Sequence, residues 1–301
     1  MSSKRISAYA AVVVLLMTMT PTLFGQAFTS LTGVVTDPTG GVIPGASIVV
    51  TNIQTGVPRD TITNSEGRYT FPQILPGTYQ IIAKSPGFTD VTIKDVQLLV
   101  NSPATINIKF EKLGAVAATV LVEAAAVQVN TTDASLGNAV STEAILELPF
   151  YARNVVNLLQ LQPGVTEDGQ VNGGKSDQAN VTLDGVDVND QVRRGAFTSV
   201  LRVTLDSVQE FRTTTTNSNA DQGRGSGAEV ALVTKTGTNE FHGSLYEYNR
   251  NEKFAANNFF SNRSGVERPA LKINIFGASI GGPIKKNKFF FFVNYEGNRN
   301  A

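Results

Sequence analysis

Short runs of apolar and β-branched residues recur every 10 to 15 positions between residues 28 and 112, separated by glycine, proline, asparagine and aspartate. Runs of this length predict strands rather than helices. In the last run, Ile106, Ile108 and Phe110 would share one face of a strand, and Asn107 and Lys109 the other. The runs lie around 30–36, 46–52, 58–63, 67–72, 77–84, 89–97 and 104–110. Seven short strands at this spacing predict an antiparallel β-sandwich.

The turns of this segment resemble those of a known domain family. The matching stretches are Gly33–Asp37, Pro44–Ala46, Gly67–Phe71 and Leu75–Tyr79. They are similar to a carboxypeptidase regulatory-like domain over residues 28–112. The resemblance implies an Ig-like, transthyretin-like sandwich, sometimes grouped with the carbohydrate-binding-like folds, and implies no peptidase activity. The resemblance leaves two roles open for this domain, a spacer and a ligand-binding module, because a fold does not by itself define a function.

Residues 1–27 have the order of an export signal. Lys4 and Arg5 form the basic start, Ala8–Met17 is apolar, and Gly25-Gln26-Ala27 predicts cleavage after Ala27. The apolar run is too short for a membrane-spanning helix, which needs about 20 residues. The chain has no cysteine, so we expect burial rather than disulfides to stabilise the exported domains.

Residues 113–140 are rich in alanine, valine and threonine and are predicted to be a linker. A small mixed α/β domain is expected over 141–235. Its predicted helices are Thr142–Leu148, stopped by Pro149, and Arg153–Leu161, stopped by Pro163-Gly164. Its predicted strands are Asn180–Val188, Val208–Thr215 and Ala228–Thr234.

This second domain also resembles a known family. The matching stretches are Leu148–Asn154, Leu159–Val165, Val181–Val186, Ser207–Phe211, Ala220–Arg224 and Val233–Gly243. They resemble the plug of TonB-dependent outer-membrane receptors, in the Oar-like branch that carries a regulatory-like sandwich ahead of the plug. The resemblance implies TonB of the inner-membrane energy complex as a partner, and a TonB box between sandwich and plug.

A TonB box is an extended segment that adds a strand to a partner's sheet edge, so its sequence demands are light. The candidate box comprises Thr119, Val120, Leu121, Val122, Glu123 and Ala124. An ordinary linker strand would show the same pattern.

The last 61 residues, 241–301, hold 12 of the 24 phenylalanines and tyrosines. Strands are predicted at Phe241–Asn249, Leu271–Ile280 and Phe289–Glu296, with apolar and polar side chains alternating in the last two. Aromatic-rich alternating strands, one long polar connection and one short turn are typical of a membrane β-barrel. We therefore assign residues 236–301 to the start of such a barrel. Phe289–Phe292 suits a membrane interface better than a soluble sheet.

Charges follow the same division. The formal net charge is zero, but residues 236–301 carry nine bases and five acids. Lys285, Lys286 and Lys288 fall in the predicted short turn, as solvated charges or as contacts to lipid headgroups. The balanced total gives no reason to expect nucleic acid as a partner.

The sequence lacks the residues that three catalytic or ligand-binding motifs require. Gly223–Gly227 lacks the Lys-Ser/Thr of a phosphate loop, and Asp184–Asp190 lacks the terminal glutamate of a calcium loop and suits a strand-to-turn segment. A zinc carboxypeptidase needs three or four protein ligands, and the chain has one histidine, His242. His242 is expected to make hydrogen bonds at the plug–barrel junction. No enzyme activity, metal or cofactor is expected.

The combined expectation is a mainly β chain with a small α/β part: a sandwich, a plug and the first strands of a barrel. The resemblance implies a receptor in the outer membrane, contacting its lipid, with plug and sandwich on the periplasmic side. Its ligand would be a nutrient such as a glycan, an iron chelate or a peptide. An exported carbohydrate-binding or adhesion protein is the alternative. Plugged transporters have about 22 strands, so we expect an N-terminal fragment that does not transport alone.

Overall fold

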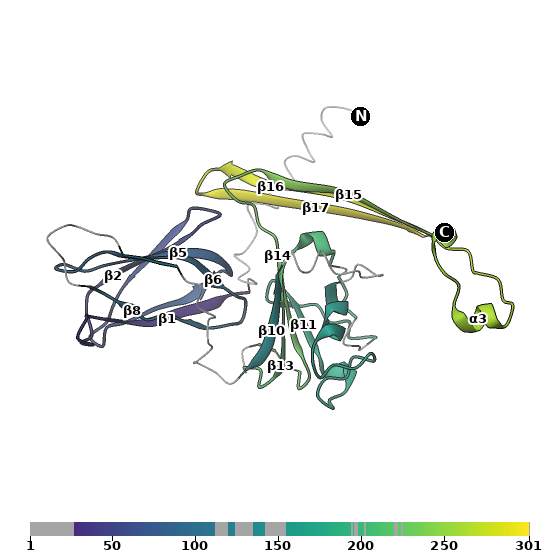
Figure 1. The fold of residues 1–301 in the computed structure, drawn as a ribbon, viewed down its shortest axis with the longest axis horizontal. Helices are drawn as coiled ribbons and strands as arrows, with labels where there is room; N and C mark the ends of the chain where they lie inside the picture. The colour runs from purple at the N-terminus through teal and green to yellow at the C-terminus, as the bar shows by residue number, and fades with distance from the viewer. Residues whose placement is uncertain are drawn as a thin grey trace, which may run out of the picture.

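The computed structural model describes residues 27–111, 120–123, 135–141, 155–193, 195, 198–201, 203–219, 222–223 and 225–300. The described residues form three units: a sandwich (27–111, with 120–123), a middle domain (135–235) and a terminal sheet (242–300) (Figure 1). The mainly β fold class expected from the sequence is confirmed. None of the helices in these ranges is long and apolar enough to cross a membrane.

The sandwich contains a strand for each of the seven apolar runs, the last run forming two. Its strands are β1 (Thr29–Thr36), β2 (Ser47–Asn52), β3 (Pro58–Ile62), β4 (Arg68–Ile74), β5 (Gly77–Lys84), β6 (Val91–Leu98), β7 (Ala104–Thr105) and β8 (Ile108–Lys109). One sheet has the order β4-β1-β7, with β8 also on β1, and the other has the order β3-β2-β5-β6-β9. Every second residue of β1 is buried, so period-two alternation fills the space between the sheets.

One glycine of this unit is required by a close approach. A Cβ atom at Gly33 would lie 1.9 Å from the carbonyl oxygen of Ile106. That approach lets β1 lie beside the last run, where Tyr69 also donates a hydrogen bond to the Ile106 carbonyl at 2.7 Å. Gly33, which belongs to one of the stretches that resemble the regulatory-like domain, therefore has a packing role.

The middle domain is a five-stranded mixed sheet in the order β10-β13-β14-β11-β12. Its strands are β10 (Leu136–Ser141), β11 (Asn180–Leu183), β12 (Val186–Asp187), β13 (Val208–Thr216) and β14 (Glu229–Thr234). The short 3-10 helix η1 (Val155–Leu161) buries Val155, Val156, Leu158 and Leu159 in a core with Phe211 and Leu232. The predicted second helix is thus a 3-10 helix from Val155, and the predicted helix Thr142–Leu148 lies outside the described residues.

Two segments of this domain differ from expectation. Residues 136–140, assigned to the linker from composition, form β10 together with Ser141 and pair antiparallel with β13. The run 180–188 is two strands, because Asp184 and Gly185 both adopt positive φ, at 50° and 82°. Two consecutive positive-φ residues make the turn of a two-residue hairpin, so β11 and β12 pair antiparallel.

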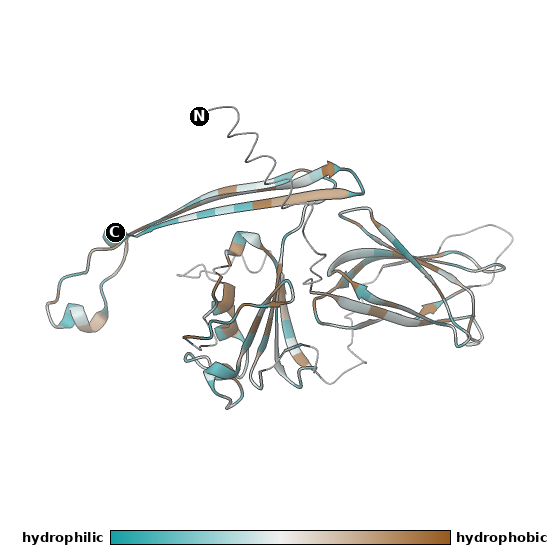
Figure 2. Ribbon diagram, turned by 180° about the vertical axis from the view of Figure 1, so that it is seen from behind, coloured by the Kyte–Doolittle hydropathy of each residue, from teal (hydrophilic) through white to brown (hydrophobic). Residues whose placement is uncertain are grey.

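The terminal sheet is an antiparallel meander of β15 (His242–Asn251), β16 (Lys272–Lys285) and β17 (Phe289–Asn300). The connection from β15 to β16 carries η4 (Glu252–Phe254) and α3 (Phe259–Arg263), whereas three residues, 286–288, join β16 to β17. The sheet runs from the joint of the sandwich and middle domain across the middle domain (Figure 1). Apolar and polar segments follow one another along its strands (Figure 2).

Candidate functional site

The two faces of the terminal sheet differ in chemistry. Cross-strand neighbours share a face, and the register aligns Leu245 with Ala278 and Tyr295, and Ile280 with Val293. Leu245 is 88% exposed, Val293 58% and Tyr295 63%. The outer face is thus apolar near the β16–β17 turn, as expected of a lipid-facing surface, whereas Asn249, Asn274 and Arg299 lie on the same face farther along the strands.

The opposite, inner face is polar and internally hydrogen-bonded. The Ser244 and Ser279 hydroxyls lie 2.8 Å apart, and Tyr246 donates to a carboxylate oxygen of Glu296 at 3.1 Å. Tyr246 reaches β17 by crossing Gly277, where a Cβ atom would lie 2.3 Å from the tyrosine hydroxyl. A glycine is therefore needed on the central strand for this bond to form.

The inner face lies against the middle domain. Thr204, the N-cap of η3 (Leu205–Ser207), donates from its hydroxyl to Asn294 Oδ1 on β17 at 3.0 Å. The polar side of the membrane-type sheet thus contacts the domain that the sequence identifies as a plug.

A pair of asparagines joins the sandwich to the terminal sheet. The Asn239 amide group donates to the Thr55 carbonyl at 2.6 Å and to Asn287 Oδ1 at 2.7 Å. The Asn287 N–H donates back to Asn239 Oδ1 at 2.8 Å, and the Asn239 N–H donates to the Gln54 carbonyl at 3.0 Å. We call Asn239, Asn287, Gln54 and Thr55 the asparagine clasp. It ties the β2–β3 turn of the sandwich to the β16–β17 turn.

A buried glutamate links the sandwich to the middle domain. Glu210 on β13 is 7% exposed and accepts a hydrogen bond from the Val100 N–H at 3.0 Å. Burial raises the pKa of Glu210 to about 7, against the opposing effects of the Val100 hydrogen bond and of Arg212. Beside it, Ala27 and Val100 pack against Ala231 and Val233, so Ala27, the residue before the predicted cleavage, lies at this contact.

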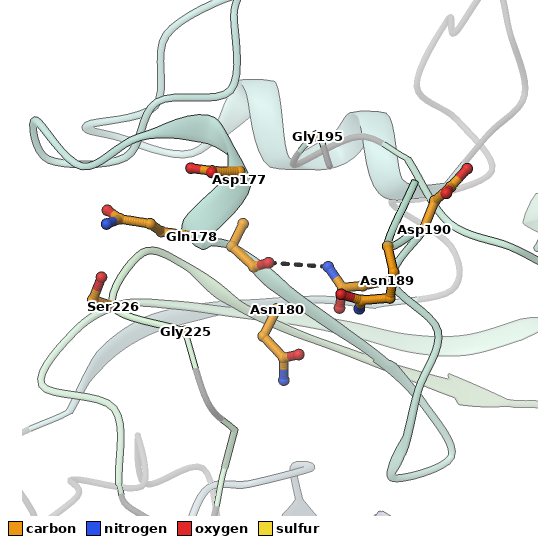
Figure 3. A pocket seen from close by; sticks show the side chains of 10 residues that line it. Asp177, Gln178, Asn180, Asn189, Asp190, Gly195, Gly225 and Ser226 are labelled. Atoms are coloured by element: carbon orange, nitrogen blue, oxygen red, sulfur yellow. Dashed lines mark hydrogen bonds between the residues drawn. The ribbon is translucent and has the colours of Figure 1, made fainter. Parts of the chain in front are cut away.

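A polar pocket of 380 Å³ opens on the middle domain (Figure 3). Asp177, Asn180, Asn189 and Asp190 line it, and Asn189 donates to the Ala179 carbonyl at 3.0 Å. Near it Glu229 is 5% exposed, and burial raises its pKa to about 7. Among the described residues, neither Glu229 carboxylate oxygen has a hydrogen-bond partner, nor does Asn180 Oδ1.

Asn180 is the neighbour of Glu229 across β11 and β14, and its Nδ2 atom and a Glu229 carboxylate oxygen both lie beside Gly223. The Asn180 side chain and the Gly225 backbone oppose the rise of the Glu229 pKa that burial causes. No group of three histidine, cysteine, aspartate or glutamate side chains that could hold a metal is found in the described ranges. Gly223 packs here, since a Cβ would lie 2.3 Å from a Glu229 oxygen. This contact gives the Gly223–Gly227 stretch a packing role.

Asp184 and His242, which the sequence places in candidate motifs, make local structural contacts. Asp184 accepts from the Thr234 N–H at 2.9 Å and the Thr234 hydroxyl at 2.8 Å, so it caps the hairpin turn. His242 Nδ1 lies 3.3 Å from the Thr238 hydroxyl and 3.1 Å from the Glu240 carbonyl. The junction role expected for His242 agrees with these contacts.

The candidate TonB box is placed only in part. Val120, Leu121, Val122 and Glu123 form β9 (Val120–Glu123), which pairs parallel with β6 at the edge of the sandwich. Thr119 and Ala124 lie outside the described residues. The segment is therefore extended, as expected, but it lies on its own chain's sheet.

The buried glutamates and the clasp were missed in the sequence. Glu210 and Glu229 sit in β-rich runs where alternation alone does not show which face is covered. Asn239 and Asn287 are 48 residues apart, and Asn239 lies 184 residues from Thr55. The one signal available in the sequence was an asparagine in a predicted turn with no nearby residue in the chain for its side chain to bind.

The comparisons with known proteins agree with this architecture. Residues 30–111 match the carboxypeptidase regulatory-like domain, and residues 233–301 match an outer membrane beta barrel domain. The two matches follow one another along the chain in the order sandwich, then barrel-type strands, with the middle domain between them. The chain is 26% identical over 275 residues to the TonB-dependent transporter Oar of Myxococcus xanthus, covering 84% of this chain and 25% of that protein. It thus spans about a quarter of the curated relative's length.

Solved structures give more distant similarities. The siderophore receptor PirA from Acinetobacter baumannii is 19% identical over 55% of this chain and 24% of its own, with a TM-score of 0.42. A catechol 1,2-dioxygenase of Acinetobacter radioresistens is 15% identical over 33% of this chain and 56% of its own, with a TM-score of 0.25.

Proposed function

We propose that the chain acts in TonB-dependent uptake of a nutrient ligand across the outer membrane. The observation that carries this proposal is the two-faced terminal sheet, whose exposed outer face is apolar and whose polar inner face contacts the middle domain through Thr204 and Asn294. A plug inside a barrel requires this arrangement, because lipid cannot satisfy polar groups. The middle domain would then be the part that moves to admit the ligand.

The connection lengths support an orientation. Outer-membrane barrels have short periplasmic turns and longer external loops. The three-residue turn 286–288 would lie on the periplasmic side, and the connection carrying η4 and α3 outside. The sandwich, clasped to that turn, would be periplasmic as well.

The TonB contact is proposed to form at β9. TonB would bind by strand addition, and β9 is already hydrogen-bonded to β6. Release of β9 from the sandwich edge would therefore precede TonB binding. The proposed ligand is a nutrient of unspecified class. A glycan is favoured only because the sandwich resembles the carbohydrate-binding-like folds.

The membrane placement is tested with single cysteines, which the cysteine-free chain permits. In outer-membrane fractions, a lipid-soluble maleimide should label Leu245→Cys and a membrane-impermeant maleimide should not. The neighbouring Ser244→Cys, on the inner face, should resist the lipid-soluble reagent. Equal labelling of both by the impermeant reagent, or release of the protein into the medium, would favour the exported carbohydrate-binding or adhesion protein.

The TonB contact has its own test. Leu121→Cys should form a disulfide cross-link with a cysteine-bearing TonB C-terminal domain. Thr61→Cys, on the opposite edge strand β3 of the same sheet, is the matched control and should not. Equal cross-linking at both positions would remove β9 as the TonB box.

A further inference from the structure

A cavity of 640 Å³ lies where the three units meet, beside the asparagine clasp. Its apolar wall includes Phe28 and Leu75 from the sandwich and Phe290, Phe291 and Phe292 from β17. Sites for small molecules typically have this size and a mainly apolar lining with few polar groups. The cavity is therefore large enough for a ligand fragment of several carbon atoms.

The charges around the cavity have one sign. Arg59, Lys235 and Lys288 line it, and no aspartate or glutamate does. Arg59 is fixed by a hydrogen bond to the Gln73 carbonyl. Lys288 is the last residue of the β16–β17 turn, which the clasp holds through the neighbouring Asn287. Three cations on an apolar wall complement a ligand with an anionic head and a hydrocarbon part.

One wall of the cavity belongs to the strand that also carries the outer face of the terminal sheet. The wall residue Phe291 lies on β17 two positions from Val293, which is exposed on that face. Phe289 and Ile284, at the same end of the hairpin, are also exposed, at 60% and 64%. The cavity wall is therefore close in sequence to the exposed apolar residues of the outer face.

We propose that the cavity binds an anionic phospholipid, with the phosphate between Arg59, Lys235 and Lys288 and the start of an acyl chain against Phe290–Phe292. The occupant follows from the basic residues, the apolar wall and the nearby exposed apolar residues of β17, and the proposal rests on the membrane placement argued above. A lipid bound there would contact sandwich, middle domain and terminal sheet at once. It would hold the sandwich against the membrane end of the hairpin.

The chain contains no tryptophan, so one introduced tryptophan reports a single site. In detergent micelles, Phe290→Trp fluorescence should be quenched by phosphatidylglycerol with brominated acyl chains, and much less by the equivalent phosphatidylcholine. In that background Lys288→Gln should weaken quenching by about fivefold, since one basic residue near an anionic lipid contributes about that factor. Lys288→Arg should restore it.

Lys286→Gln is the matched control, because Lys286 belongs to the same turn and does not line the cavity. Equal losses for Lys286→Gln and Lys288→Gln, or equal quenching by both lipids, would overturn the cavity site. Displacement of the brominated lipid by soluble glycerophosphoglycerol would also overturn the proposal, because the cavity would then be a site for free phosphate esters.

A second reporter separates this proposal from the proposed function. Tyr295→Trp, on the exposed outer face, should be quenched by both brominated lipids if that face meets lipid. Loss of quenching at Tyr295→Trp would contradict the membrane placement itself. Quenching at Tyr295→Trp with none at Phe290→Trp would overturn the cavity proposal alone.

Discussion

Glu210 is the residue at which the contact between sandwich and middle domain depends on pH. Its carboxyl accepts the Val100 N–H in a buried setting, and its pKa is raised to about 7. The unfolded chain would ionise Glu210 near pH 4.3. Between these values the folded state holds a proton that the unfolded state has lost, so raising the pH favours unfolding. Above about pH 7 both states are ionised and the effect stops growing.

Glu210→Gln should therefore stabilise the protein increasingly as the pH rises from about 4.5 to 7, by up to about 3 kcal/mol. The amide keeps an oxygen for the Val100 N–H and carries no charge to bury. Chemical unfolding of both proteins at pH 5 and pH 8 measures the effect. The exposed Glu66→Gln is the control and should follow the native protein. A stability difference for Glu210→Gln that does not change with pH would contradict the argument.

Asn239 holds the asparagine clasp with both ends of its side chain. Asn239→Ala removes three side-chain hydrogen bonds, and the Asn287 N–H loses its acceptor. Each such bond contributes about 1 kcal/mol, so amide exchange at Asn287 should accelerate about tenfold or more. Hydrogen–deuterium exchange by mass spectrometry resolves the turn 286–288. Asn274→Ala, whose exposed side chain pairs with Asn249, should leave that turn unchanged. Unaltered exchange in Asn239→Ala would mean that the clasp is not a constraint in solution.

At the scale of elements, strands were predictable where alternation and turn chemistry agreed. The seven sandwich runs and the strands at 208–216 and 229–234 lie within a few residues of expectation. Strand β10 was not predictable, because Leu136–Ser141 carries little apolar alternation and is ordered by pairing with β13. The split of 180–188 depended on positive φ at Asp184, a turn signal hidden inside an apolar run.

The faces of the terminal sheet lead to a prediction about insertion. Val293→Lys places a charge on the apolar outer face, and Ser244→Lys places one on the polar inner face. Lysine facing lipid costs about 2–4 kcal/mol at the middle of a barrel wall and little near its interfaces. Val293→Lys should therefore reduce the fraction of the protein in washed outer membranes, and Ser244→Lys should reduce it less. Equal loss for both would contradict the two-faced assignment.

At the scale of the whole molecule, joints between units were beyond the sequence. The clasp and the Glu210–Val100 contact join positions 48 to 184 residues apart, and no local pattern records such pairings. The order of domains, by contrast, was visible from motifs, since each unit carries its own turn chemistry. The resemblance to a receptor family therefore came from the sequence, and the contacts between units came from the structure.

The separate cores predict how the molecule unfolds. Leu31 lies in the sandwich core and Leu159 in the core of the middle domain, both fully buried. Among the described residues, the apolar cluster that spans these two units consists of four small side chains beside Glu210. Leu31→Ala and Leu159→Ala should each cost about 2–5 kcal/mol, from lost transfer energy and the cavity left behind. Because little apolar surface couples the units, each substitution should lower the transition of its own unit. Differential scanning calorimetry would then show two transitions that move independently. A joint shift of both transitions by either substitution would mean that the polar contacts of Glu210 and the clasp couple the units into one cooperative body.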